Sequence, residues 1–450
     1  MKAKRIVAFL ALLAMLFTLA ACNNTADPGT TTPDNSGTTT PDNTGSETPA
    51  PASDMTLKFW SNFGASGNTY DYLEYVKAGF EKENEGITVE VAYQGGYDAV
   101  AEKLLAGLAA KEVPHLSQIE EALLPQFSAA AEDLTKYVSQ EALDRYSEGL
   151  MASSYDNGVL KAVPFARSMT MMWYNKDMFK ECGLPEEGPK TWTDVYEYSK
   201  IINEKLGIYG LTGWFDSDAW YWESAVYAAG LNIVTPDGKS VDFDNEDGYR
   251  YVELMQNMAK EGLFYNTYTN QDNLSQLALE EFWNERAAMT FDSTGGMAEK
   301  VGRAKEAGFE LGACFSPADK TSACVSGGSN VIMLAANPEE EKAVAGKMIE
   351  YLSTDDPAIQ VFKMTGYLPT TTGALETQTY KDMVAEYPLY QYVIDQIGIA
   401  HARPWTRNWK EMYTVIVEEL QAAMLDLNTP GREFVHNAAV KCQEIIDQNA

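Results

Sequence analysis

The sequence predicts a mixed α/β fold, and residues 55–91 carry the pattern that predicts it. Residues 55–59 alternate apolar and polar side chains, as a strand does, and residues 87–91 repeat that alternation. Between them, apolar residues recur at helical spacing at Tyr72, Leu73, Val76 and Phe80. A strand, a helix and a strand in this order indicate a right-handed parallel βαβ unit.

Two loops follow these strands, and each contains aromatic residues. In parallel sheets, ligands bind outside the carboxyl ends of the strands. The loops at 60–67 and 93–97 should therefore lie at the binding edge, and they carry Trp60, Tyr93 and Tyr97. Turns alone would explain the glycines of these loops. The aromatic residues instead favour contact with a polar ligand.

The first 54 residues indicate export and anchoring. Basic residues precede a short apolar run at 6–19, which is typical of a signal peptide covering residues 1–22. Residues 19–22, Leu-Ala-Ala-Cys, resemble a bacterial lipobox, so we expect a lipid on Cys22. Residues 23–54 are rich in Thr, Pro, Asp and Asn and predict a disordered tether. We expect a Gram-positive-like lipoprotein on the extracellular face of the cell membrane.

Composition restricts the partners and the chemistry. A formal charge of −31 disfavours nucleic acid and anionic lipid surfaces as partners. About 400 residues follow the tether, enough for two hydrophobic cores. The three histidines and the later cysteines show no metal-ligand spacing, so we expect neither a metal nor a cofactor. Cys182 and Cys442 are expected to be free thiols, and a bond between Cys314 and Cys324 stays open.

Residues 213–222 hold five aromatic side chains in ten positions. Trp220 and Trp222 fall in a helical pattern, which favours a place in the core. Trp214 stands beside a glycine and before an acidic turn, which favours stacking on a ligand.

Four acidic residues between 242 and 253 fit part of a calcium-loop template. The template needs glycine at its sixth position, which here is Asp247. Capping of the following helix by Asp244 or Asn245 is therefore the favoured interpretation.

Several segments together resemble the family 1 extracellular solute-binding proteins, the sugar-binding components of ABC importers. The segments are 59–63 (Phe-Trp-Ser-Asn-Phe), 95–97, 124–127 with 133–134, 163–165, 173–177, 189–193, 286–289 before Ser293, 326–329, and 365–369 (Thr-Gly-Tyr-Leu-Pro). Their order matches across residues 55–450, and the sn-glycerol-3-phosphate-binding branch is the most similar. The resemblance implies a binding protein and not an enzyme.

The resemblance also implies the ligand contacts. With Trp60 from the first loop they are Tyr97 (or Tyr93), Glu120, Ser168, Trp214, Ser293, Thr294, Gly327, Gly328, Tyr367 and a late arginine, either Arg403 or Arg407. Hydroxyls, backbone amides and a guanidinium would hold a phosphate. Arg167, Asp216 and Asp218 depart from the branch pattern, so a neutral mono- or oligosaccharide stays open.

The implied architecture is a two-lobed, type II fold like that of maltose-binding protein, with the ligand in a cleft and a hinge between the lobes. Residues 55–165 with 325–370 would form the N-terminal lobe, and residues 168–315 with 372–450 the C-terminal lobe. The expected partners are ABC permease subunits, because the chain has no ATP-binding motif, and the protein is expected to be a monomer. A surface sensor or adhesin is the main alternative, followed by a glycoside hydrolase, for which no carboxylate pair stands out.

Overall fold

The computed structural model describes residues 54–266 and 274–449. The predicted signal peptide, Cys22 and all but the last residue of the predicted tether lie outside the described residues. No helix in the part of the chain that the structure describes combines the length and the apolar character needed to cross a membrane.

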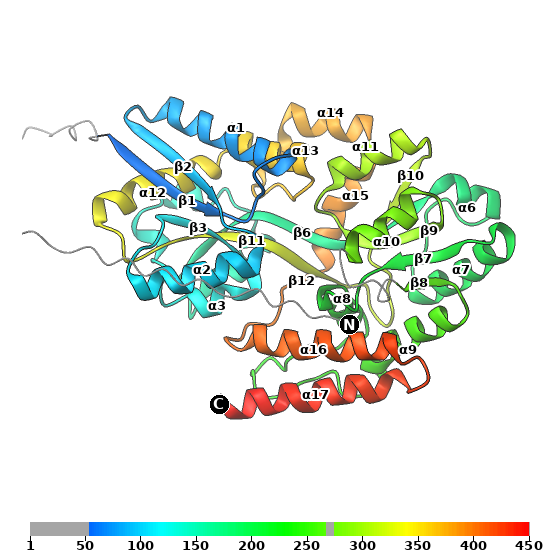
Figure 1. Cartoon of the computed structure of the whole chain (residues 1–450). Helices are drawn as coiled ribbons and strands as arrows, with labels where there is room; N and C mark the ends of the chain where they lie inside the picture. The colour runs from blue at the N-terminus through cyan, green and yellow to red at the C-terminus, as the bar shows by residue number, and fades with distance from the viewer. Residues whose placement is uncertain (1–53, 267–273, 450) are drawn as a thin grey trace, which may run out of the picture. The chain divides into compact units, whose positions relative to one another are not determined.

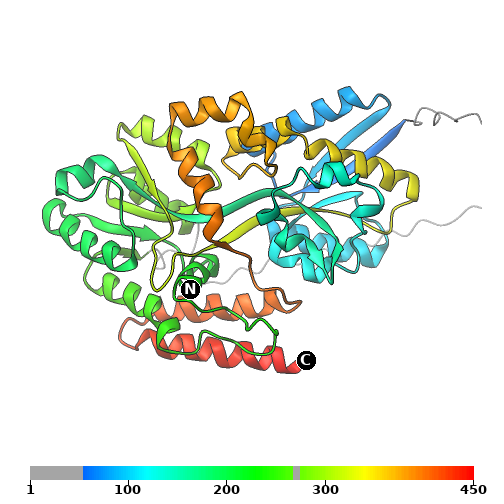
Figure 2. The same ribbon diagram turned by 180° about the vertical axis from the view of Figure 1, so that it is seen from behind.

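The main sheet runs through the whole folded body in the order β2-β1-β3-β11-β6-β9-β7-β8, with β10 and β12 added beside β6 and β11 (Figures 1 and 2). Its strands are β1 (Met55–Ser61), β2 (Ile87–Tyr93), β3 (Leu116–Glu120), β6 (Ala162–Asn175), β7 (Tyr209–Gly213), β8 (Phe264–Asn266), β9 (Ala287–Ser293), β10 (Leu311–Cys314), β11 (Cys324–Met333) and β12 (Ala400–His401). A separate hairpin pairs β4 (Tyr155–Asp156) with β5 (Val159–Leu160).

The first lobe is built on β2, β1 and β3, which are parallel to one another. Its helices are α1 (Asn68–Glu83), α2 (Tyr97–Ala110), α3 (Leu124–Phe127), α4 (Gln140–Leu143), α12 (Glu339–Leu352) and α13 (Asp355–Thr365). The predicted βαβ unit is confirmed, with β1 and β2 each extending two residues beyond the predicted alternation. The apolar side of α1 (Tyr72, Leu73, Val76, Phe80) packs against this part of the sheet.

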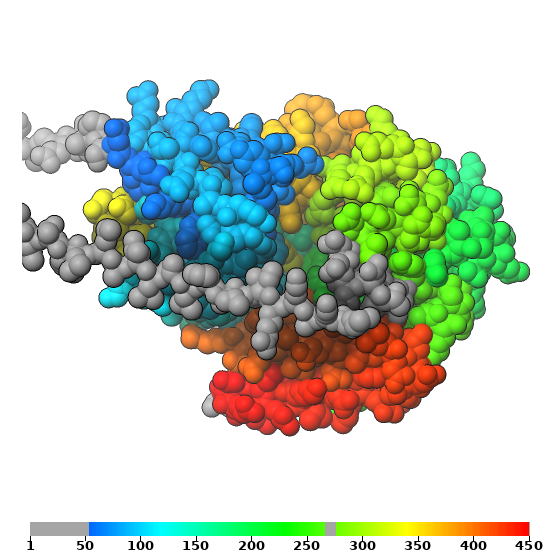
Figure 3. Space-filling model, in the orientation of Figure 1, coloured from blue at the N-terminus to red at the C-terminus, as the bar shows by residue number. Residues whose placement is uncertain are grey.

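The second lobe is built on β9, β7 and β8, again parallel to one another, with β10 antiparallel to β6. Its helices are α6 (Lys176–Cys182), α7 (Trp192–Leu206), α8 (Ala219–Ala228), α9 (Glu246–Lys260), α10 (Leu274–Trp283), α11 (Met297–Ala307), α16 (Trp409–Leu425) and α17 (Gly431–Gln448). In the space-filling view α16 and α17 form one continuous orange and red surface (Figure 3). The remaining helices are α5 (Glu148–Met151), α14 (Gln378–Glu386) and α15 (Leu389–Asp395), with single 3₁₀ turns at Glu121–Leu123, Leu134–Lys136, Ala152–Ser154, Gly373–Glu376 and Gln396–Ile399.

Two long strands join the lobes. β6 pairs with β11 along residues 162–169 and then with β9 along residues 170–174. β11 in turn pairs with β3 of the first lobe. All fourteen residues of β6 are buried, so the strand has no solvent face, and its sequence shows no alternation of apolar and polar residues.

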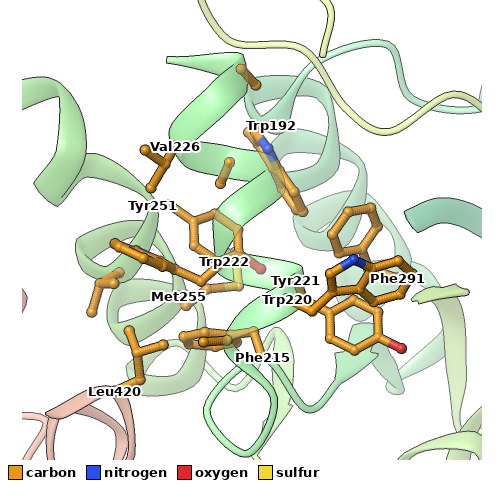
Figure 4. Packing of buried hydrophobic residues seen from close by; sticks show 14 of the residues in the cluster. Trp192, Phe215, Trp220, Tyr221, Trp222, Val226, Tyr251, Met255, Phe291 and Leu420 are labelled. Carbon is orange, nitrogen blue, oxygen red and sulfur yellow. The ribbon is translucent and has the colours of Figure 1, made fainter. Parts of the chain in front are cut away.

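Each lobe has its own hydrophobic core. The core of the second lobe is rich in aromatic residues, because every residue of α8 is buried and four of them are aromatic: Trp220, Tyr221, Trp222 and Tyr227. Trp222 meets the ring of Phe243 edge-on at 5.0 Å, and Figure 4 shows it among Tyr251 and Met255, with Trp220 and Tyr221 on another side of the helix. The prediction of Trp222 as a core residue is therefore confirmed.

The four cysteines among the described residues, Cys182, Cys314, Cys324 and Cys442, are free, buried thiols. Cys314 and Cys324 are not bonded to each other, which closes the question that the sequence left open. The Cys314 thiol donates instead to the carbonyl oxygen of Pro189 at 3.2 Å. Burial raises the pKa of both thiols above its usual value, so neither is a ready nucleophile.

The segment 242–253 caps α9 and forms ion pairs with a neighbouring helix. The Asn245 side chain accepts from the backbone amides of Asp247 and Gly248 at 3.1 and 3.3 Å, which confirms the predicted cap of α9. Glu246 and Glu253 both pair with Arg432. Within residues 54–266 and 274–449, no acidic or histidine cluster has the arrangement of a metal site.

Asp216 lies buried in the turn after β7, 2% exposed, and its Oδ2 has no hydrogen-bond partner among the described residues. Burial raises the pKa of this carboxyl to about 6. Because the folded state then binds the proton more tightly than the unfolded state, the ionised carboxylate destabilises the fold, fully above pH 6 and not at all below about pH 4.

The substitution Asp216→Asn is therefore expected to raise the free energy of unfolding by about 2 kcal/mol at pH 7.5. Urea unfolding at pH 7.5 and at pH 4 measures this, and the gain should shrink towards zero at the lower pH. The exposed Asp382→Asn serves as the control and should show no comparable gain. An equal gain at both pH values would contradict the electrostatic cause.

Candidate functional site

A cavity of about 420 Å³ lies where the two lobes meet. Its lining residues are Gly96, Tyr97, Asp98, Glu120 and Leu123 of the first lobe, Ser168, Gly327 and Gly328 of the joining strands, Tyr367 after α13, and Asp218, Trp220, Tyr221, Ser293, Arg403, Trp409, Lys410 and Tyr413 of the second lobe. Six of these side chains are aromatic and most others are polar. Such a lining suits a small hydroxylated ligand.

The floor of the cavity is formed by glycines of β11. A Cβ atom on Gly327 would lie 2.7 Å from the ring of Trp220, so only glycine lets the indole lie flat against the strand. Gly328 has φ +90°, and a Cβ there would lie 2.0 Å from the carbonyl oxygen of Ala166. The Trp220 Nε1 donates to the carbonyl oxygen of Ser326 at 3.0 Å, which fixes the indole over this floor.

Arg403 lies at the centre of the charged groups. It donates to Glu223 from Nε at 3.2 Å and from Nη2 at 2.7 Å, and its Nη1 donates to Glu120. The rings of Trp409 and Tyr413 each lie 5.3 Å from its guanidinium carbon. Glu120 is the last residue of β3 in the first lobe, and Glu223 belongs to α8 of the second. Arg403 therefore links the two lobes through these carboxylates.

Burial and Arg403 have opposite effects on the pKa values of Glu120 and Glu223. Burial raises the pKa of Glu120, and the opposing attraction of Arg403 does not cancel that rise. Burial likewise raises the pKa of Glu223 to about 7 against the same arginine. Burial disfavours the charged guanidinium, but Glu223 and Glu120 together hold the pKa of Arg403 above its usual value.

A second set of contacts surrounds this centre. Lys410 of α16 pairs with Asp98 of α2 at 2.6 Å, which adds another ion pair between the lobes. The Asp218 side chain accepts from the backbone amide of Trp220 at 3.1 Å and from the hydroxyl of Tyr413 at 2.5 Å. Each cation of the cavity is therefore already paired with a carboxylate.

The buried hydroxyls of the cavity stay protonated. Burial raises the pKa of Tyr97 well above its usual value, and Tyr367 and Glu120 raise it further. Burial also raises the pKa of Tyr367, whose ring stacks on Phe63 at 5.6 Å. At neutral pH both are hydrogen-bond donors as well as acceptors.

Residues 75–388 match the family of bacterial extracellular solute-binding proteins. The chain belongs to this family.

Curated proteins resemble the chain along most of its length. The sn-glycerol-3-phosphate-binding periplasmic protein UgpB of Shigella flexneri serotype 5b is 26% identical over 403 residues, covering 83% of this chain and 89% of that protein. UgpB of Escherichia coli K12 has the same identity and coverage. Both relatives are named as binding proteins.

Solved structures of binding proteins confirm the two-lobed, maltose-binding-protein-like fold. UgpB from Mycobacterium tuberculosis in complex with glycerophosphocholine superposes with a TM-score of 0.76 at 22% identity, covering 88% of this chain and 98% of that one. The cyclic alpha-maltosyl-1,6-maltose binding protein from Arthrobacter globiformis has a TM-score of 0.74 at 18% identity, with 87% and 99% covered.

The structure of this solute-binding protein brings most of the predicted contact residues together. Those that line the cavity are Tyr97, Glu120, Ser168, Ser293, Gly327, Gly328, Tyr367 and Arg403. They come from both lobes and from the strands that join them. Their role as ligand contacts stays a prediction.

The structure places the other four predicted residues away from the cavity. Trp60 packs against α2, and the Thr294 hydroxyl, fully buried, accepts from the backbone amide of Met169 at 3.0 Å. Arg407 is exposed. Trp214 contacts Tyr221, a lining residue of the main cavity, with the two rings edge-on at 5.0 Å. Trp214 itself lines a second cavity.

Several lining residues were not predicted from the sequence. Trp220 was expected in the core, and it is indeed buried, but one side of it faces the cavity. Trp409, Lys410 and Tyr413 come from the first turns of α16. Trp409 and Tyr413 are four positions apart at the start of a helix that closely follows Arg403. This spacing, which places both rings on one face of the helix, is the sequence pattern from which they could have been predicted.

Proposed function

We propose that this solute-binding protein captures a glycerophosphate, a glycerol bearing a phosphate monoester or diester, and delivers it to an ABC importer. One observation carries the proposal: a buried guanidinium, Arg403, lies in the same cavity as the hydroxyls of Ser168, Ser293, Tyr97 and Tyr367. A guanidinium with convergent hydroxyl donors is the usual way for a protein to hold a phosphate. The UgpB relatives, named for glycerol phosphate, support the same class.

The remaining cavity groups suit the glycerol end of such a ligand. Glu120 would accept hydrogen bonds from glycerol hydroxyls, and the Trp220 ring would cover the carbon atoms. A bound phosphate would also take over part of the charge balance of Arg403, which Glu120 and Glu223 supply in this structure.

The lobes would close on the ligand about the joining strands. The proposed N-terminal lobe is 55–165 with 325–370, and the proposed C-terminal lobe is 168–315 with 372–450. Ligand contacts from both lobes favour the closed state, which the permease subunits would recognise. Cys22 would anchor the protein to the membrane as a lipoprotein, and residues 23–54 would serve as its tether.

A neutral carbohydrate is the second candidate, and the carboxylates favour it. Asp98, Glu120 and Asp218 line the cavity together with six aromatic rings. Carboxylates accept hydrogen bonds from sugar hydroxyls, and aromatic rings cover the apolar face of a sugar. These three acids would repel a phosphate dianion, so a monoanionic diester fits better than a monoester.

Titration calorimetry on residues 55–450 tests the proposal with glycerol 3-phosphate, glycerophosphocholine, glycerol, inorganic phosphate and glucose. We expect the two glycerophosphates to bind and glycerol to fail, and Trp220→Ala to weaken glycerophosphate binding by roughly tenfold or more. Trp220→Phe, which keeps a ring, should lose less. Trp405→Ala, an exposed tryptophan outside the cavity, is the control. Binding of glucose alone would favour the carbohydrate candidate and exclude the glycerophosphate.

A further inference from the structure

Carboxylates outnumber cations around the main cavity in the described part of the chain. Three carboxylates and two cations line the cavity, and a fourth carboxylate lies directly behind Arg403. The carboxylates belong to Asp98, Glu120, Asp218 and Glu223, and the cations to Arg403 and Lys410. When all of these groups are ionised, negative charge is already in excess before a ligand enters. An anionic ligand adds to that excess, which costs free energy unless a proton is taken up as well.

Three of the four carboxylates have stabilising contacts other than Arg403. Asp98 is largely exposed to water. Asp218 accepts hydrogen bonds from a backbone amide and from the hydroxyl of Tyr413. Glu120 lines the cavity and keeps a fifth of its side chain exposed, so water reaches its carboxylate. Each of the three therefore keeps a hydrogen-bond donor or water when Arg403 binds a ligand.

Glu223 has no such alternative. Its side chain is 0% exposed, and among the described residues Arg403 alone donates to it, from Nε at 3.2 Å and from Nη2 at 2.7 Å. A phosphate bound to Arg403 competes for the same guanidinium and weakens this attraction. Because a buried carboxylate without its cation is strongly disfavoured, the neutral acid becomes the more stable form of Glu223. Burial already raises the pKa of this carboxyl to about 7, so a further rise takes it above neutral pH.

The neighbouring groups favour the same proton uptake. The charged and titratable groups of the cluster are Arg403 after β12, Glu120 at the end of β3, Asp218 before α8, Tyr227 in α8, and Tyr413 with Lys410 in α16. Besides burial, Asp218 and Glu120 raise the pKa of the Glu223 carboxyl, and Arg403 opposes them. Burial raises the pKa of both tyrosines, so they stay neutral. His401 of β12 stacks on Tyr227, and burial lowers its pKa, so it is neutral above pH 7 as well.

We propose that Glu223 positions Arg403 and takes up a proton from the solvent when an anionic ligand binds. The proposal rests on the proposed function, because only an anionic ligand competes for the guanidinium. The proton converts the Glu223 carboxylate into a carboxylic acid. This acid still accepts a hydrogen bond from Nε, which keeps the guanidinium in place, while Nη2 is released to donate to the phosphate. Glu223 is thus a positioning residue that offsets the charge of the ligand.

Calorimetry with glycerophosphoglycerol tests the uptake without any variant, because this phosphodiester keeps one negative charge over the pH range used. Titrations at pH 8 in HEPES and in Tris, which give up a proton with different heats, measure the number of protons taken up. We expect between about half and one proton per ligand. The pKa of Glu223 is higher in the complex than in the free protein, so affinity is full below pH 7. It should fall by roughly tenfold or more between pH 7 and pH 8.5.

Two variants and a control assign the proton to its residue. Glu223→Gln resembles the neutral acid and keeps an oxygen that accepts from Arg403. It should take up no proton, and at pH 8.5 it should bind the diester more tightly than the unmodified protein does. Glu120→Gln should retain the fall of affinity with pH. Glu306→Gln, which alters an exposed residue of α11, is the control and should match the unmodified protein.

The outcomes separate this inference from the proposed function. Binding of the diester without proton uptake would overturn the role of Glu223 and leave the proposed function standing. Uptake that persists in Glu223→Gln and disappears in Glu120→Gln would also overturn that role. Binding of glucose together with no binding of the diester at any pH would exclude the proposed function and this inference with it.

Discussion

Replacing Arg403 with methionine is expected to weaken glycerophosphate binding by at least about 100-fold, because the phosphate loses its buried charge-assisted hydrogen bonds. The same change should lower the free energy of unfolding by about 3 kcal/mol, since it leaves Glu120 and Glu223 without their cation. Glu223 is fully buried, so its carboxylate cannot recover the lost interaction from water. Calorimetry measures the first effect and urea unfolding the second.

Arg407→Met is the matched control for this prediction. It removes the same charge four residues later, from an exposed side chain outside the cavity, and should change neither quantity measurably. Adding Glu223→Gln to Arg403→Met should restore part of the stability, because one buried charge is removed, without restoring binding. Wild-type affinity in Arg403→Met would exclude the guanidinium as the phosphate ligand.

The spacing of apolar residues in the sequence correctly predicted those helices and strands that bury one face and expose the other to water. The alternation in β1 and β2 and the helical spacing in α1 correspond to burial on one face, which the structure shows. β6 has no such face, and its fourteen buried residues carry no period from which its length could be read. Its place as a strand between the lobes came from the resemblance to the family.

Glu120 and Ser293 were expected in the site from the resemblance to the family. In the structure they end β3 and β9, which places both at the carboxyl edge of the sheet. Trp409 and Tyr413 reach the cavity only because α16 packs beside α8, nearly 200 residues earlier in the chain. No local pattern encodes that packing.

Neighbouring residues of one type were the hardest to separate. Arg403 and Arg407 lie in one segment, and only the position of Glu223 opposite Arg403 distinguishes them. Trp214 and Trp220 are likewise close in sequence. The turn between them directs Trp220 over Gly327 and leaves Trp214 behind Tyr221, facing the second cavity.

Arg167→Met is expected to cause the largest loss of stability, about 4 kcal/mol in free energy of unfolding. Arg167 is 2% exposed in β6 and makes an ion pair with Glu121, which is 1% exposed. It also donates to Ser153, Asn330 and Ser326 at 2.9, 3.0 and 3.2 Å. Without it the buried Glu121 keeps only the hydrogen bonds from Ser153 and Ser326.

Urea unfolding measures this loss. Arg145→Met is the control, because it breaks an exposed ion pair with Glu141 and should cost less than about 0.5 kcal/mol. Adding Glu121→Gln to Arg167→Met should recover part of the stability, since the unpaired charge is then gone. A loss below about 1 kcal/mol in Arg167→Met would mean that water reaches Glu121 and replaces the arginine.

Ligand affinity should fall with stability in Arg167→Met, although the arginine does not line the main cavity. Each of three network members is the direct neighbour of a cavity residue: Arg167 of Ser168, Glu121 of Glu120, and Ser326 of Gly327. In strands, consecutive side chains point to opposite faces, so in β6 and β11 the ion-pair network lies on the side away from the cavity. It holds β6, β11 and the end of β3 together, and the cavity floor keeps its shape only while that network is intact. A variant that lost stability but kept full affinity would show that the floor is held by the backbone ladder of these strands alone.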